Sequence, residues 1–405
     1  MDLKGNAIIG QSGGPTSVIN SSLVGAIETC QSSDHIQQIF GMNGGIEGVM
    51  KESFFDLTDL SQEELNGLRE TPSSTLSSSR HKLKDDELPK VMEILQRYEI
   101  RYFFLIGGND TMDTVHRVEA YCKENGYEIR GIGIPKTVDN DLYGTDHTPG
   151  FASAARYNAL SVKQAGQLAF DMRKVDQFVV FQTIGRDAGW LAAATALARE
   201  HENDAPHLIY CPERRFDSEQ FLKDAKASIE KNGWVSVVVS EGLLYEDGTP
   251  VSASKTSDKF NNTEFGAMGG ASVGLQVHKM LREATGLRGE FQIVESLNMS
   301  AIDRAVESDL EEAFQCGKKA VEYALSGTSG VMVTIERESN EPYKVTYGQS
   351  PLSNVAVRAK AMPDDYINEI GNDVTQKALE YLKPLIGSMP SFTRLDQKFI
   401  ERKAK

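Results

Sequence analysis

The amino-acid sequence predicts an α/β fold in which mostly parallel sheets carry helices on both faces. Short apolar or β-branched runs alternate with amphipathic stretches over most of the 405 residues, and glycine or polar turn residues stand directly after several of these runs. Such runs are typical of strands buried on both faces, and the alternation indicates strand–helix–strand units. Because ligands bind beyond the carboxyl ends of the strands in such sheets, we expect a site there.

The runs and stretches define the expected elements in order. Strands are expected at residues 6–10, 101–106, 130–134, 177–182, 207–211 and 234–240. Helices are expected at 17–30, 111–124, 150–169, 188–199, 218–231 and 271–283, where apolar residues recur with helical spacing. The Ser- and Thr-rich segment 71–80 predicts a loop, and the polar segment 245–265 predicts a mobile loop or lid. The tail after residue 342 is expected to hold one helix near 373–385.

Composition limits the partners and the compartment. The chain has 43 Lys and Arg against 58 Asp and Glu, a formal net charge of −15, and so acidic a chain argues against nucleic-acid and membrane binding. The longest apolar run, 190–198, is shorter than the ~20 residues that span a bilayer. Residues 1–10 resemble no secretory signal, and the four cysteines form no CxxC pair, which argues against disulfides or zinc. We therefore expect a soluble, reduced, cytoplasmic protein.

Residues suited to binding phosphate follow three successive predicted strands. Their ends read GQSGGPTS (residues 10–17), GGNDT (107–111) and GIPKTVDND (133–141). Alone, each could be an ordinary turn. Together they supply what phosphoryl transfer needs: backbone donors, a cation, a carboxylate for Mg²⁺ and a base. Neither the dinucleotide GxGxxG nor the GxxxxGK[ST] loop is present, which disfavours a dehydrogenase and a Walker-type nucleotide site.

These segments resemble the 6-phosphofructokinase family. QSGGPTSVIN, IGGNDTMDT, GIPKTVDNDLYGTDHTPGF, IGRDAGWLAA and SEG occur in the family's order between residues 6 and 242, and CGKKAVEYALSGTSGVMVTI continues the match to 335. The resemblance implies two lobes of doubly wound, mostly parallel sheet. It also implies a donor-binding lobe at 1–149, an acceptor-binding lobe at 150–298, and a closing segment at 299–405 that packs back on both.

The resemblance assigns roles only at matching positions. It implies Asp139 as the general base, with Lys136 and Arg186 as catalytic cations. The implied donor-binding residues are Gly13, Gly14, Arg80, Asp110 and Lys136. The implied acceptor-binding residues are Thr137, Asp139, Asp141, Gly185, Arg186 and Glu241. The implied cofactor is Mg²⁺ on Asp110, with Asn109 as a weaker, neutral ligand where many members have Asp.

Two positions point to the phosphate donor. ATP-using members of the family have glycine where this chain has Asp110 and Lys136. A carboxylate at Asp110 would repel the α-phosphate of a nucleotide, and the ammonium of Lys136 adds a point charge for phosphate. The pair resembles the diphosphate-dependent branch, so we expect inorganic diphosphate as the donor.

The acceptor is less determined by the sequence. At the positions where the family holds a sugar 6-phosphate, the chain has Gln177, Glu290, Ser296 and Met299, with Asn298 before Met299. Each lost cation forgoes a charge-assisted bond of ~1.5–3 kcal/mol. Either other cations, such as Arg304, Arg358 or Lys360, hold the phosphate, or the acceptor is an unphosphorylated sugar or polyol.

The expected reaction is the reversible glycolytic conversion of fructose 6-phosphate to fructose 1,6-bisphosphate. A diphosphate-dependent kinase of another sugar or polyol is the alternative. A non-catalytic regulatory member is a further alternative, which the intact TVDND, Lys136 and Arg186 disfavour. The resemblance also implies a homodimer or homotetramer.

Overall fold

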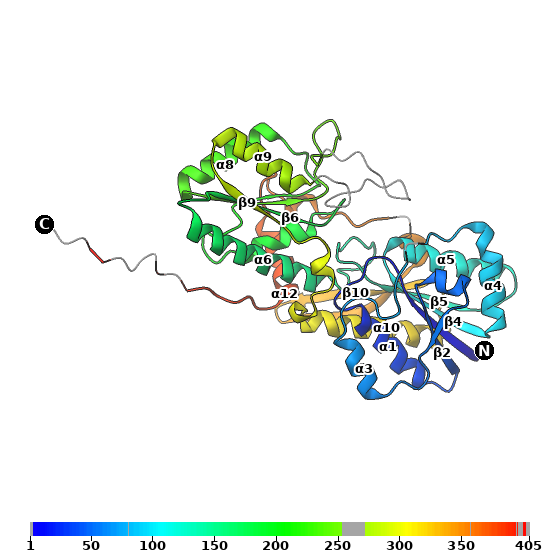
Figure 1. Cartoon of the computed structure of the whole chain (residues 1–405). Coiled ribbons are helices and arrows are strands. Elements are labelled where there is room, and N and C mark those ends of the chain that lie inside the picture. The colour runs from blue at the N-terminus through cyan, green and yellow to red at the C-terminus, as the bar shows by residue number, and fades with distance from the viewer. Residues whose placement is uncertain are drawn as a thin grey trace.

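The computed structural model describes residues 3–79, 81–252, 272–356 and 358–393, together with 395, 400 and 401. Its strands form a seven-stranded sheet of order β11-β10-β5-β4-β1-β2-β3 and a four-stranded sheet of order β7-β8-β6-β9. Figure 1 shows the two sheets in separate lobes, with α6 and α12 between them. This confirms the expected α/β class, in which two mostly parallel sheets carry flanking helices.

The larger sheet has a parallel centre and antiparallel edges. Its strands are β1 (Gly5–Gln11), β2 (Ile36–Met42), β3 (Phe54–Asp56), β4 (Ile100–Gly107), β5 (Arg130–Pro135), β10 (Val331–Asn340) and β11 (Tyr343–Pro351). Only the pairs β2–β3 and β10–β11 are antiparallel. Every residue of β1 is buried, because Ala7 and Ile9 face one core and Ile8 faces another.

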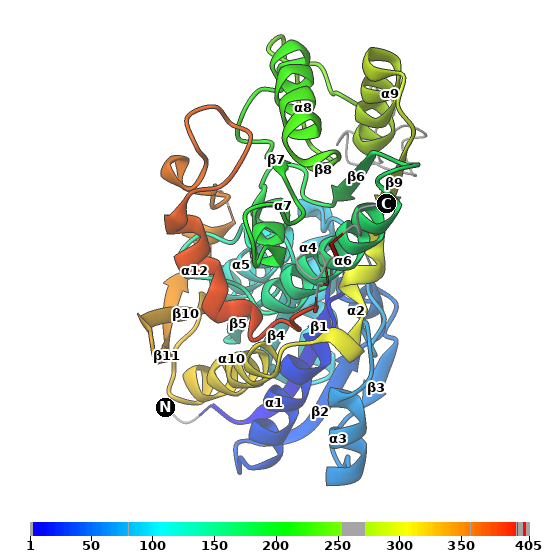
Figure 2. The same cartoon turned by 90° about the vertical axis from the view of Figure 1, so that its left-hand side faces the viewer.

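Helices cover both faces of the larger sheet. One face carries α1 (Ile19–Gln31), α3 (Gln62–Arg69) and α10 (Glu307–Leu325); the other carries α2 (Ile46–Met50), α4 (Leu88–Arg97), α5 (Asn109–Glu124) and α11 (Leu352–Val355). Helices α1 and α10 touch closely through glycines: a Cβ on Gly25 would lie 2.0 Å from the Phe314 oxygen, and one on Gly317 would lie 1.9 Å from the Ser22 oxygen. Figure 2 shows the two helices side by side.

The smaller sheet is parallel throughout. Its strands are β6 (Phe178–Thr183), β7 (Leu208–Tyr210), β8 (Val235–Ser240) and β9 (Gly289–Ile293). One face packs on α6 (Phe151–Met172), α7 (Trp190–Ala194) and α12 (Gln376–Ile386), the other on α8 (Ser218–Asn232) and α9 (Val273–Thr285). Short 3-10 turns complete the chain at Asp85–Glu87, Thr195–Ala198, Glu295–Met299, Ile302–Arg304 and Asp364–Tyr366.

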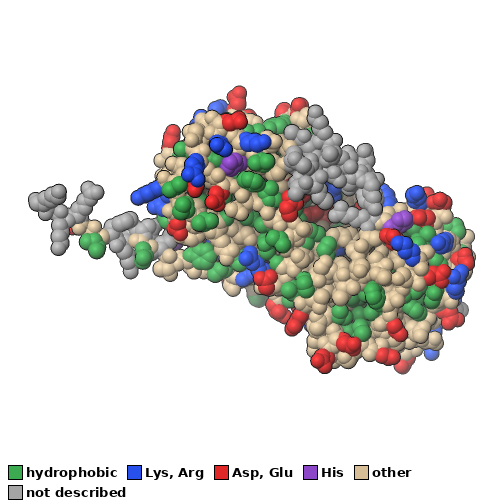
Figure 3. Space-filling model, in the orientation of Figure 1, with side chains coloured by type: hydrophobic (Ala, Val, Ile, Leu, Met, Phe, Trp, Pro, Cys, Tyr) green, Lys and Arg blue, Asp and Glu red, His purple; other side chains and the backbone are tan. Residues whose placement is uncertain are grey.

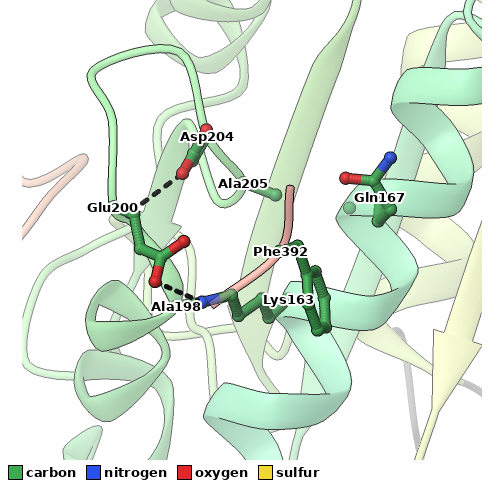
Figure 4. Close-up of a pocket in the computed structure, with 8 residues that line it drawn as sticks. Lys163, Gln167, Ala198, Glu200, Asp204, Ala205 and Phe392 are labelled. Carbon is green, nitrogen blue, oxygen red and sulfur yellow. Dashed lines mark hydrogen bonds and ion pairs between the residues drawn. The ribbon is translucent and has the colours of Figure 1, made fainter. Parts of the chain in front are cut away.

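The last third of the chain joins both lobes. Strand β10 extends the larger sheet beyond β5, and α12 packs on α6 of the smaller lobe. The tail then crosses α6. In Figure 4, Phe392 lies beside Lys163, whose Nζ pairs with Glu200 Oε1 at 3.1 Å. The pocket drawn there contains none of the residues expected to bind substrate.

The expected strands are confirmed, with ends that shift by at most one residue. The single helix expected at 188–199 is wrong: α7 gives way to a 3-10 turn at Thr195–Ala198, whose small side chains pack closely on α6 and allow a tighter turn. The tail helix near 373–385 is confirmed as α12. The sequence analysis does not predict strands β2, β3, β9, β10 and β11, because their sequences are polar or half exposed. Most of the loop expected at 245–265 lies outside the described residues.

The described surface mixes charges of both signs, and Figure 3 shows acidic and basic side chains interspersed on one face. No helix among the described residues is long and apolar enough to cross a membrane.

Candidate active site

The glycine turn after β1 is shaped by close neighbours. Gly13 has φ +76°, a left-handed conformation that favours glycine. A Cβ on Gly14 would lie 2.6 Å from the methyl group of Met299. The Lys136 ammonium reaches this turn from β5 and donates to the Gly14 oxygen at 2.5 Å. Lys136 is only 4% exposed, so its charge is concentrated beside the backbone of the turn.

The Ser- and Thr-rich loop lies against the same turn. Ser78 Oγ donates to the Gly13 oxygen at 2.7 Å, and the Gly13 N–H donates to the Ser79 oxygen at 3.4 Å. Arg80, the next residue and an expected donor ligand, lies outside the described residues. Ser78 and Ser79, which precede it, lie at the glycine turn.

The loop after β5 carries two carboxylates. The Thr137 Oγ1 accepts from the Asp139 N–H at 3.1 Å, and the Thr137 oxygen accepts from Thr148 Oγ1 at 3.0 Å. Asn140, between the two aspartates, is fully buried and has φ +55°. These bonds fix Asp139 and Asp141 in a defined loop rather than a flexible turn.

Charges from both lobes act on Asp139. Burial and the Asp141 charge raise the pKa of Asp139 to about 7, although Arg186 and Lys136 oppose the rise. Burial also raises the pKa of Asp141 against the effects of Thr137, Lys136 and Lys360. A carboxylate with a pKa near neutrality is well suited to accept a proton at physiological pH.

The smaller lobe contributes the residues after β6 and β8. The Glu241 carboxylate accepts from the Gly185 N–H at 3.1 Å. Gly185 has φ +122°, and a Cβ there would lie 2.6 Å from the Ala188 oxygen. Burial raises the pKa of Glu241 to about 7, with Asp139 and Glu295 adding to the rise and Arg186 opposing it. Asp139, Glu241 and the exposed Arg186 thus act on one another across the two lobes.

Oxygen atoms suited to a hard cation lie beside Asp141. Asn109 begins α5, and its Nδ2 lies 3.5 Å from Asp141 Oδ2. The Asn109 Oδ1 is buried and has no hydrogen-bond partner among the described residues. Asp110 is exposed in the first turn of α5. No group of three His, Cys, Asp or Glu within the described ranges is arranged to hold a metal, so substrate oxygens would have to complete a Mg²⁺ site. Oxygen donors of this kind fit Mg²⁺, which normally shares its ligands with phosphates and water.

The structure does not bring the four replaced acceptor positions together. Gln177 and Glu290 lie at the amino ends of β6 and β9, where the Gln177 N–H donates to the Arg288 oxygen at 2.8 Å. Gly185 and Arg186 follow the opposite, carboxyl end of β6. Ser296 and Met299 lie in the 3-10 turn Glu295–Met299, and of these Met299 contacts the glycine turn. Gln177 and Glu290 therefore do not face the site formed by their own chain.

The alternative cations are engaged elsewhere. Arg304 donates to Ser161 Oγ at 3.0 Å and lies over the Tyr157 ring. Arg358 lies over the Tyr143 ring. Lys360 Nζ donates to the Asn140 side chain and to backbone oxygens. None of the three is presented as an obvious ligand for an acceptor phosphate.

Two residues near the site, Asn140 and Glu295, had no role assigned from the sequence, and Asn298 was noted only as a replaced acceptor position. Asn298 is 1% exposed, and neither amide atom has a hydrogen-bond partner among the described residues. Glu295 has φ +45° and lies close enough to raise the Glu241 pKa. The aspartates on either side of Asn140 identify the loop in the sequence. The neighbouring residues do not indicate which distant residues the Asn140 side chain contacts.

Two mostly parallel sheets bring together a buried lysine, a glycine turn and paired carboxylates of one lobe and an arginine of the other. This arrangement defines a phosphoryl-transfer enzyme. Residues 6–324 match the family model described as Phosphofructokinase. The chain belongs to this family and, within it, to the diphosphate-dependent branch.

Relatives match the chain almost end to end. Pyrophosphate–fructose 6-phosphate 1-phosphotransferase from Halomonas elongata is 37% identical over 98% of each chain, and that from Rhodospirillum rubrum is 38% identical over 97% of each. Sulfofructose kinase from Alkalicoccus urumqiensis is 33% identical over 89% of this chain and 91% of its own. The crystal structure of the pyrophosphate-dependent phosphofructokinase from Nitrosospira multiformis superposes with a TM-score of 0.86 at 37% identity, covering 96% of this chain and 94% of that chain.

Proposed function

We propose that the enzyme transfers a phosphoryl group from inorganic diphosphate to the 1-hydroxyl of fructose 6-phosphate, reversibly, as a step of glycolysis. The observation that carries the proposal is Asp139, a half-buried carboxylate whose pKa is raised although the charges of Arg186 and Lys136 oppose the rise. The relatives from Halomonas elongata and Rhodospirillum rubrum, whose names state this reaction, support the substrates.

The residues divide the chemistry among themselves. Asp139 takes the proton of the acceptor hydroxyl while the oxygen of that hydroxyl bonds to the phosphorus. The bond to the bridging oxygen breaks, and orthophosphate leaves with that electron pair. Lys136, Arg80, Gly13 and Gly14 hold the diphosphate, while Arg186 neutralises charge on the transferring group.

The acceptor is held by residues of the loop after β5 and by residues that follow β6 and β8. In this proposal Thr137, Asp141, Gly185 and Glu241 position the sugar, with Glu241 accepting bonds from its hydroxyls. One carboxylate oxygen of Glu241 accepts a hydrogen bond from the Gly185 N–H at 3.1 Å. This bond fixes the orientation of the carboxylate and therefore also the direction of its second oxygen. Fixed geometry of this kind shortens the search for a reactive arrangement.

We place Mg²⁺ on Asp110, Asn109 and Asp139, together with diphosphate oxygens. The buried Asn109 Oδ1, which has no hydrogen-bond partner within the described part of the chain, supports this placement. When bound, the ion would neutralise part of the diphosphate charge. Asp110 also supports diphosphate over ATP, because a carboxylate at the start of α5 disfavours a further phosphate group nearby.

A matrix of donors against acceptors tests the proposal. Diphosphate, ATP and ADP are each combined with fructose 6-phosphate, fructose and polyols in the presence of Mg²⁺, and orthophosphate release and ³¹P spectra are recorded. We expect turnover with diphosphate and fructose 6-phosphate. Converting Asp139 to Ala should slow it by about 100- to 10,000-fold. Turnover with ATP alone would overturn the assignment of the donor.

A second acceptor class has its own support. Asn298, which precedes Met299 in the chain, offers a buried amide whose two polar atoms have no hydrogen-bond partner among the described residues. Glu295 and Glu241 place two carboxylates close together. Amides and carboxylates suit hydroxyl groups, whereas a phosphate dianion would face an adverse charge. The sulfofructose kinase relative indicates that acceptors differ among similar proteins. Saturation by fructose or a polyol, without saturation by fructose 6-phosphate, would favour this class.

We further propose that the chain acts in the cytoplasm as a homodimer or homotetramer. The outer strand β9 exposes Phe291 at 40%, and Leu297 nearby is 62% exposed, an apolar edge of the kind that a second copy could cover. The four cysteines are free and buried, which is consistent with a reducing compartment. Light scattering after size-exclusion chromatography tests the state; a monomer at micromolar concentration would contradict it.

A further inference from the structure

Asn140, between the two aspartates of the loop, is held from outside its own lobe. Its Oδ1 accepts from Lys360 Nζ at 3.2 Å, and its Nδ2 donates to the Tyr381 hydroxyl at 3.1 Å. Asn140 is fully buried and adopts φ +55°, a conformation that non-glycine residues seldom take. Both ends of its amide are therefore occupied by residues from the last third of the chain.

Lys360 is built into the protein rather than presented to a ligand. Its ammonium donates to the oxygens of Asp146 at 2.5 Å and Thr145 at 3.5 Å, in addition to Asn140 Oδ1. Since an ammonium has three N–H groups, these three oxygens can satisfy it. The Trp190 ring lies 5.2 Å away and screens the charge from water.

The backbone of Ala359 and Lys360 binds the loop at Asp141 and Leu142, directly after Asn140. The Lys360 N–H donates to the Asp141 oxygen at 2.7 Å, and Ala359 forms an antiparallel bridge with the buried Leu142. Lys360 thus contacts the main chain of one aspartate directly and the residue between both aspartates through its side chain.

Tyr381 joins the same anchor from α12. Its hydroxyl donates to the Asp146 oxygen at 2.7 Å, the carbonyl that also receives Lys360. The Asp146 side chain is itself bound by Arg337 Nε at 3.0 Å and lies 2.7 Å from His147 Nδ1. Asp146, whose carbonyl oxygen both Lys360 and Tyr381 bind, is therefore held rigidly in place.

We propose that Lys360 and Tyr381 are positioning residues for phosphoryl transfer, which hold both ends of the Asn140 amide and so fix the directions of Asp139 and Asp141. Asn140 is the only link between the two aspartates, so its backbone conformation sets where each carboxylate points. A change in that conformation would misplace Asp139 against the acceptor while leaving the glycine turn and Lys136 unchanged. The proposal rests on the proposed role of Asp139 as the base.

The kinetic test compares Lys360→Met with Lys377→Met. Methionine keeps the length of the side chain and removes its donors; Lys377 belongs to the same segment but pairs with Asp365 at the surface, 66% exposed. We expect Lys360→Met to lower kcat by about 10- to 100-fold with an unchanged KM for diphosphate, and Lys377→Met to behave as wild type. Tyr381→Phe should lower kcat less, and the double variant should lose less than the product of the two effects, because both act through Asn140.

An activity-independent measurement separates this proposal from the proposed function. Amide hydrogen exchange of residues 137–142 should accelerate by about tenfold or more in Lys360→Met and not in Lys377→Met. Unchanged exchange there, or a wild-type kcat, would overturn the positioning role. So would a loss of kcat that only follows a general loss of thermal stability. Wild-type protein that fails with every diphosphate–acceptor pair would instead refute the proposed function, and the exchange result would still decide the role of Lys360.

Discussion

Replacing Asp139 by Asn should make the protein more stable at neutral pH while it abolishes turnover. The pKa of Asp139 is raised from 3.8 to about 7, mainly by burial. At ~1.4 kcal/mol per pH unit, the fold disfavours the ionised carboxylate by about 4 kcal/mol. Because the side chain is partly exposed, solvent screening reduces the effect, and we expect about 2 kcal/mol.

The pH dependence follows from the direction of the shift. Between about pH 4 and 7 the folded protein keeps the Asp139 proton while the unfolded chain has lost it, so stability falls as pH rises through this window. Above pH 7 the whole cost is present. Asp139→Asn removes it, so the variant should match wild type near pH 4 and exceed it at pH 8 by roughly 2–4 °C in Tm.

Calorimetry at pH 4.5, 6 and 8 in metal-free buffer measures the effect, since a bound cation would itself favour the ionised form. Asp110→Asn, at an exposed position of α5, is the matched control and should show no such trend. An Asp139→Asn variant that is equally or less stable than wild type at pH 8 would refute the view that the fold strains this carboxylate for catalysis.

Three further outcomes are expected. The rate constant kcat/KM should fall towards acidic pH, because Asp139 must be ionised. Arg186→Leu should move this fall to higher pH, because the Arg186 charge lowers the Asp139 pKa. An unmoved profile would contradict the effect of Arg186 on Asp139 across the lobes. Glu241→Gln should raise KM for the acceptor by about tenfold and leave KM for diphosphate unchanged, as initial rates with each substrate varied will show. Lys136→Met should weaken diphosphate binding by about 1.5–3 kcal/mol, measured by titration calorimetry, and equal affinity in the two proteins would remove Lys136 from the donor site.

Local sequence predicted the elements whose chemistry is local. The glycine turn at Gly13 and the loop of Asp139 could be identified because each follows a buried strand directly. The contacts between Asn140 and Lys360 could not, because they join positions far apart in the chain through a buried amide. Matching to the family's motifs also assigned Gln177 and Met299 to one acceptor site. The parallel pairing of β6 with β9 instead places Gln177 at the amino end of β6, opposite the carboxyl end that Gly185 and Arg186 follow. Such placements depend on strand direction, which spacing alone does not give.

The contact between α1 and α10 has a consequence for biosynthesis. Helix α1 emerges early from the ribosome, but the surface that covers it, α10, and the strand β10 that borders β5 are made far later. At ~5–20 residues per second, the interval is tens of seconds. During this time Gly25 and Ala26 of α1, which lie against α10 in the finished protein, lack the helix that covers them. The first lobe to be translated is thus completed only near the end of translation, and its nascent apolar face is a natural substrate for chaperones.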